Sequence, residues 1–67
     1  MEIRKRLARN LRKLRQESGW SQEEFAYQAD LHRTYVSDLE RGTRNPSVLI
    51  LEKLGKALGV PPGRLLD

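Results

Sequence analysis

Helical periodicity is the feature of this sequence that most limits its fold. Apolar residues recur three or four positions apart along the chain, and no segment alternates apolar and polar residues with period two. The glycines and prolines are expected at the joints between helices. The 67 residues allow one small domain, residues 1–67, because a chain of this size buries only about 60% of its unfolded surface. The sequence therefore predicts a compact all-α domain of five helices.

The first half of the chain predicts two helices. The first is expected at about residues 2–17, before Gly19, with an apolar stripe of Ile3, Leu7, Leu11 and Leu14. The segment WSQEEF predicts that a second helix starts at Ser21, because Ser21 and Glu24 have the spacing of a capping box. Trp20 and Phe25 have the spacing of a hydrophobic staple around the same cap.

A third helix is expected at about residues 32–41. Leu31 and Val36 repeat the staple spacing around a cap at His32. Two short helices joined by a turn of about three to four residues form either a helix-turn-helix or an ordinary helical hairpin. In a helix-turn-helix the second helix can enter the major groove of DNA. The spacing alone leaves both interpretations open for residues 21–41.

The last third of the chain predicts a fourth helix at about residues 48–58, capped by Ser47 and closed by Gly59. Its expected core stripe is Val48, Leu51, Leu54 and Leu58. Pro61 can open a short final turn. Some apolar residues fall off the stripe and predict either extra core packing or an exposed patch that serves as a dimer interface: Leu49, Ile50, Ala57, Leu65 and Leu66.

Charge and composition narrow the function. The net charge is +4, and seven of the thirteen basic residues lie in the first fifteen positions. This favours a polyanionic partner, either nucleic acid or an acidic membrane surface, although a solvated helix face accounts for part of the cluster. Cysteine is absent and histidine occurs once, so we expect no metal site, no cofactor and no enzyme activity. No apolar run is long enough to span a membrane, and we expect a cytoplasmic protein.

The outward face of the third helix is a compact array of hydrogen-bonding groups. On a helical wheel Thr34, Ser37, Asp38 and Arg41 lie opposite the apolar side, with Arg33 beside them. An Arg at such a position can donate two hydrogen bonds to guanine, and Thr or Ser can contact several bases.

Other residues near this face have more than one interpretation. Asp38 can accept from cytosine, but we favour a role in holding Arg41 or Arg33 in position. Tyr35 lies at the boundary of the face and is either a half-buried packing residue or a DNA contact. Gln22, at the start of the second helix, can donate to a phosphate beside free backbone N–H groups.

The segments WSQEEFA, LHRTYVSDLERGTRNPS and LEKLGKALGV resemble the Cro and phage-repressor type of helix-turn-helix domain, the XRE-like family. The pattern is most similar to controller proteins of restriction-modification systems, and it covers about residues 7–66. The resemblance implies a lambda-repressor-like fold that binds a pseudo-palindromic double-stranded DNA operator as a homodimer.

The resemblance also implies roles for single residues. It assigns base contacts to Arg33, Thr34 and Ser37, a DNA contact to Tyr35, and backbone contacts to Gln22, Arg44 and Asn45. It assigns a structural ion pair to Arg15 and Glu40. Asp30 stands where the family often has Gly, and His32 stands where it often has a Ser or Thr cap. Asp tolerates a left-handed conformation, so we expect the turn to persist, whereas His32 is a weaker cap and is expected to be a passive, solvent-exposed residue.

The favoured function is therefore a sequence-specific DNA-binding transcriptional regulator with the helix at about residues 32–41 in the major groove. Phosphate contacts are expected from Gln22, Arg41, Arg44 and Asn45, and Asp38 is retained as a further candidate at the base-facing surface. One alternative is an antitoxin or protein-interaction module that uses the helix-turn-helix for autoregulation. Another is non-specific binding to nucleic acid or an anionic membrane through the first helix. No small-molecule ligand is indicated.

Overall fold

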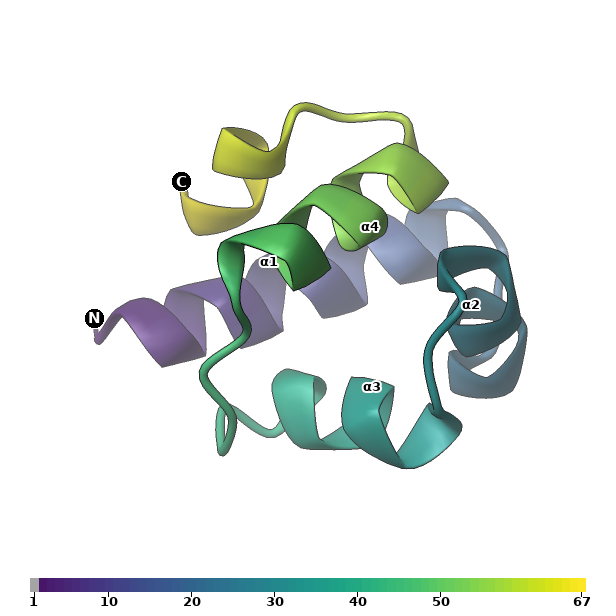
Figure 1. The fold of residues 1–67 in the computed structure, drawn as a ribbon, viewed down its shortest axis with the longest axis horizontal. Helices are drawn as coiled ribbons and strands as arrows, with labels where there is room; N and C mark the ends of the chain where they lie inside the picture. The colour runs from purple at the N-terminus through teal and green to yellow at the C-terminus, as the bar shows by residue number, and fades with distance from the viewer. Residues whose placement is uncertain (1) are drawn as a thin grey trace.

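The computed structural model describes residues 2–67, which form four α-helices and a short 3-10 helix (Figure 1). The elements are α1 (Ile3–Glu17), α2 (Gln22–Ala29), α3 (Arg33–Glu40), α4 (Val48–Leu58) and η1 (Pro62–Leu66). Within residues 2–67 there is no β-strand, and the all-α prediction is confirmed. The fifth predicted helix is a five-residue 3-10 helix that begins at Pro62.

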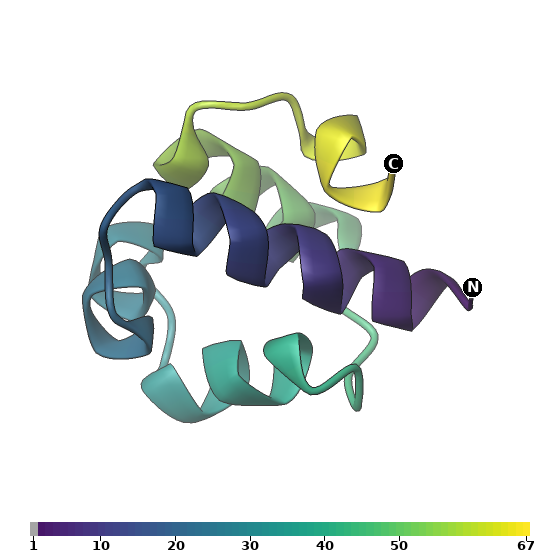
Figure 2. The ribbon, with the colours of Figure 1, turned by 180° about the vertical axis from the view of Figure 1, so that it is seen from behind.

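Helix α3 is supported from behind by two other helices. It packs against α1 and α2, while α4 packs against α2 and η1, and η1 also contacts α1. Figures 1 and 2 show α3 on the opposite side of the molecule from η1, with one broad face turned away from every other element. The fold therefore leaves the outer face of α3 uncovered.

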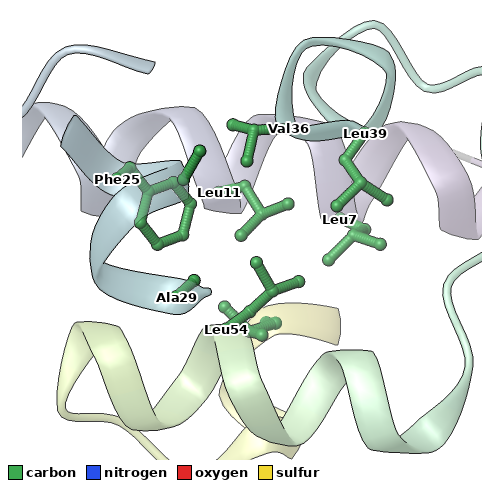
Figure 3. Packing of buried hydrophobic residues seen from close by; sticks show 9 residues of the cluster. Leu7, Leu11, Phe25, Ala29, Val36, Leu39 and Leu54 are labelled. Carbon is green, nitrogen blue, oxygen red and sulfur yellow. The ribbon is translucent and has the colours of Figure 1, made fainter. Parts of the chain in front are cut away.

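The hydrophobic core fills the space between the helices. Leu11 of α1 lies among Val36 and Leu39 of α3, Phe25 of α2 and Leu54 of α4 (Figure 3), and all five side chains are at most 1% exposed. Full burial of one such side chain contributes about 1.5–3 kcal/mol to folding. Helix α3 is thus positioned by packing against residues distant in the sequence.

The predicted caps are present with one difference. Ser21 Oγ accepts from the Glu24 backbone nitrogen at 3.0 Å, and the rings of Trp20 and Phe25 stack with centroids 6.0 Å apart. The Glu24 carboxylate does not complete the capping box, because it accepts from Gln28 Nε2 at 3.0 Å instead. In α4, Ser47 Oγ accepts from the backbone nitrogen of residue 50 at 3.2 Å.

Several apolar residues lie elsewhere than predicted. Val48, expected in the core, is 79% exposed. The other three residues of the predicted stripe, Leu51, Leu54 and Leu58, do pack in or against the core, and Ile50 and Ala57 pack there as well. Leu65 is fully buried and cannot form part of a dimer interface, so that prediction is wrong.

Gly55 lies inside α4, whereas the sequence predicted that the glycines lie at the joints between helices. It is buried, and a Cβ atom on it would lie 2.7 Å from the carbonyl oxygen of Val60 and 3.3 Å from Cα of Pro62. The absence of a side chain therefore lets the segment before η1 fold closely back over α4. Gly19, Gly42 and Gly59 do lie after helices, each with a positive φ.

Candidate nucleic-acid interface

A tight turn of three residues, Asp30 to His32, joins α2 to α3. Asp30 has φ 57° and ψ 49°, the left-handed conformation, and the Leu31 backbone nitrogen donates to the Ala26 carbonyl at 2.8 Å. These features close α2 with the geometry that glycine usually provides. The predicted tolerance of Asp30 for the turn is confirmed. His32 is exposed and makes no side-chain cap, as expected.

The inner face of α3 is fixed by burial and by charge. Val36 and Leu39 are buried in the core, and the Glu40 side chain at the end of the helix is fully buried. Arg15 Nε donates to Glu40 Oε2 at 2.7 Å, and Arg15 Nη2 donates to Oε1 at 3.0 Å. The ion pair implied by the resemblance is therefore present, and it is bidentate.

Two further groups approach the same carboxylate. Gln22 Nε2 donates to Glu40 Oε1 at 3.2 Å, and Arg12 Nε lies 3.8 Å from that oxygen. The Gln22 amide thus has one hydrogen directed into the protein, and the second remains for the predicted phosphate contact. The contact of Arg12 was not predicted, although its position one helical turn before Arg15 places both residues on one face of α1.

The outer face of α3 carries a second polar network. Arg41 forms an ion pair with Asp38 and donates from Nη1 to Ser37 Oγ at 3.1 Å. Arg44 Nη2 lies 3.5 Å from Asp38 Oδ2, and the Arg44 guanidinium lies 4.5 Å from the centre of the Tyr35 ring. Asp38 thus holds Arg41, as the sequence favoured, together with Arg44, while Arg33 is not one of its partners.

The other residues predicted to contact DNA lie at two different places in the structure. Arg33 and Thr34 are exposed at the start of α3, and neither side chain has a hydrogen bond or ion pair within residues 2–67. Asn45 is exposed and borders a shallow groove of about 200 Å³ between α1, the loop before α4 and η1. Leu66 borders the same groove and is half-buried.

Of the residues predicted for a dimer interface, Leu49 is the one that is clearly exposed. Its side chain is 71% exposed, next to Val48 in the first turn of α4. Ile50 is partly buried against the core. The exposed apolar surface of α4 therefore consists of Val48 and Leu49.

Asn10 is a structural residue that the sequence reasoning missed. It is only 7% exposed, and its Nδ2 atom donates to the carbonyl oxygens of Leu65 at 2.9 Å and Asp67 at 2.8 Å. A polar residue between Leu7 and Leu11, on the buried side of α1, was the available signal. Through this side chain α1 anchors η1.

Residues 2–67 contain neither a cluster of three His, Cys, Asp or Glu side chains that could hold a metal ion nor a helix that is long and apolar enough to cross a membrane. Residues 11–65 match the helix-turn-helix family model HTH_3. The chain belongs to this family. The matched segment of the helix-turn-helix chain runs from the middle of α1 through α2, α3 and α4 into η1.

Relatives within the helix-turn-helix family include controller proteins, which confirms the likeness found in the sequence. The chain is 53% identical over 66 residues to the control protein C.BamHI of Bacillus amyloliquefaciens, covering 97% of this chain and 82% of that protein. It superimposes on the restriction-modification controller protein C.AhdI from Aeromonas hydrophila with a TM-score of 0.89 at 40% identity, covering 92% and 94% of the two chains. A hypothetical transcription factor from Neisseria gives a TM-score of 0.95 at 47% identity, covering 98% and 76%.

Proposed function

We propose that this chain is a transcriptional regulator that binds double-stranded DNA sequence-specifically, with α3 in the major groove. The observation that carries the proposal is the division of α3 into two faces. Val36 and Leu39 are buried, whereas Arg33 and Thr34 project outward with no bonds to other described side chains. A short helix held from behind, with free donors near its N-terminus, has the geometry that major-groove recognition requires.

Each side chain on this face has a role that its chemistry supports. Arg33 is proposed to donate to O6 and N7 of guanine, and Thr34 to contact a neighbouring base. Ser37 and Tyr35 lie further along the face and contact DNA once the arginines that cover them move. Phosphate contacts are proposed for Gln22, Arg41, Arg44 and Asn45.

We further propose that the protein acts in the cytoplasm as a homodimer. Val48 and Leu49 present adjacent apolar side chains at the start of α4, 79% and 71% exposed, and a two-fold axis near them would bury both. Two copies of α3 about 34 Å apart then match half-sites one helical turn apart. The operator is accordingly expected to be pseudo-palindromic.

Selection of bound duplexes from a random DNA pool tests this function. The proposal predicts enrichment of one sequence with two inverted half-sites about 10 base pairs apart, centre to centre. Enrichment of a single half-site would support specific binding but reject the homodimer. A pool that stays random after several rounds would reject sequence-specific binding.

A further inference from the structure

The two arginines nearest the end of α3 are bound to a carboxylate of the protein itself. Asp38 Oδ1 pairs with Arg41 and Oδ2 lies 3.5 Å from Arg44, so both carboxylate oxygens have a cationic partner. The Asp38 side chain is 18% exposed, while the side chains of Arg41 and Arg44 are 60% and 47% exposed. The cations therefore lie over the carboxylate, on the solvent side.

The same contacts cover two residues proposed to face DNA. Arg41 donates to Ser37 Oγ at 3.1 Å, and the Arg44 guanidinium stacks on the Tyr35 ring with 4.5 Å to its centre. In this arrangement the hydroxyl of Ser37 and the ring of Tyr35 each have an arginine as a partner. Contact with DNA through these groups requires that the arginines leave them.

We propose that Asp38 is an internal counter-ion that competes with DNA phosphates for Arg41 and Arg44 and so lowers the affinity of the protein for DNA of any sequence. The inference rests on the proposed function. A carboxylate and a phosphate offer guanidinium the same kind of paired oxygen acceptors, so each arginine must exchange one anion for another on binding. The Asp38 charge left on the DNA-facing side is then repelled by the phosphates.

The contacts of Asp38 favour competition over base reading. In the unbound protein both Asp38 oxygens are paired with arginines, and neither is left free as a carboxylate that reads cytosine would need. Release of two exposed ion pairs corresponds to a change of about fivefold to tenfold in the DNA dissociation constant. Asp38 thus affects the affinity for DNA indirectly, through Arg41 and Arg44.

The test compares Asp38→Asn with Glu52→Gln. Asn has the shape of Asp without its charge, and Glu52 is an exposed residue of α4 with no ion pair within the described residues. Fluorescence anisotropy would measure binding to the selected operator and to a scrambled duplex across a salt series. Circular dichroism would verify that each variant is folded.

We expect Asp38→Asn to tighten binding to both duplexes about fivefold to tenfold, and Glu52→Gln to tighten it less than twofold. The plot of log affinity against log salt should steepen by about 0.9 for each additional phosphate neutralised. Equal effects of the two variants, or a loss of operator affinity in Asp38→Asn, would overturn the inference while leaving the proposed function intact. Absence of specific binding by the unmodified protein would instead reject the proposed function.

A double-mutant cycle adds a second, independent readout. Removal of the Arg44 guanidinium should weaken DNA binding at least about threefold more in the Asp38→Asn background than in the unmodified protein, because only there does Arg44 bind phosphate without first giving up its ion pair with Asp38. An Arg44→Ala effect of equal size in both backgrounds would show that Asp38 does not compete for this arginine.

Discussion

Arg15 Nε donates to Glu40 Oε2 at 2.7 Å, which joins α1 to the last residue of α3. The Glu40 side chain is fully buried and that of Arg15 is 12% exposed, so the pair lies where water screens it little. Gln22, the first residue of α2, donates to the same carboxylate. One anion thus links α1 to both helices of the helix-turn-helix, α2 and α3.

Glu40→Gln should destabilise the protein. The substitution leaves the largely buried Arg15 guanidinium without a counter-charge, and loss of one partner of a buried pair costs about 3 kcal/mol. Urea unfolding followed by circular dichroism would measure the change in the free energy of unfolding. Glu52→Gln is the matched control, with an expected change within about 0.5 kcal/mol. Equal stability of the two variants would show that the pair does not hold α3.

Two substitutions of Asp30 should change the free energy of unfolding in opposite directions. Its φ of 57° is disfavoured for residues with a Cβ atom, so Asp30→Gly should raise the free energy of unfolding by about 0.5 kcal/mol. Asp30→Ala should lower it by about 1 kcal/mol, because Ala lacks the tolerance of Asp for this conformation. Thermal melts of the three proteins give the order directly. A higher stability for Ala than for Gly would mean that the turn does not adopt this backbone conformation.

Gly55→Ala should also be destabilising, although Ala is normally the better helix former. The added Cβ would lie 2.7 Å from the Val60 carbonyl oxygen, so backbone must shift at a cost of about 1–3 kcal/mol. Gly63→Ala is the control, since nothing lies within 4 Å of a Cβ at that position. If both substitutions leave the unfolding midpoint unchanged, the chain does not approach α4 as closely as described.

The structure separates two leucines that the sequence had grouped in one interface. Leu49→Glu places a charge on a side chain that is 71% exposed, so the fold should persist while the dimer dissociates. Leu65→Glu buries a charge in the core and should prevent folding. Sedimentation equilibrium with circular dichroism would distinguish these outcomes. A Leu49→Glu protein with the same mass as the unmodified protein would exclude Leu49 from the interface.

Local signals explain why the helix starts were predictable. Ser21 and Ser47 cap α2 and α4 as expected, because a cap depends on residues within one turn. The direction in which α4 faces was not predictable in the same way. Val48 and Ile50 differ in burial because other helices reach one and not the other, and no periodic pattern within α4 contains that information.

In the candidate site, too, local features were predictable from the sequence and long-range contacts were not. The outward position of Arg33 and Thr34 follows from helical geometry alone. The contact between Arg44 and Asp38 joins a loop to a helix, and its existence depends on the path of the chain after Gly42, which has φ 75°. Residue types indicated that Asp38 binds an arginine, but the second arginine and the stacking on Tyr35 required the structure.

The most direct test of sequence-specific recognition by α3 is the effect of Arg33→Ala on binding to the selected operator, to its single-base variants and to a scrambled duplex. Loss of a bidentate contact to guanine should weaken operator binding by about 1–3 kcal/mol and abolish the preference for guanine at one position of each half-site. Affinity for the scrambled duplex should change little by comparison. Equal weakening on all duplexes, with the base preference retained, would contradict base recognition by Arg33.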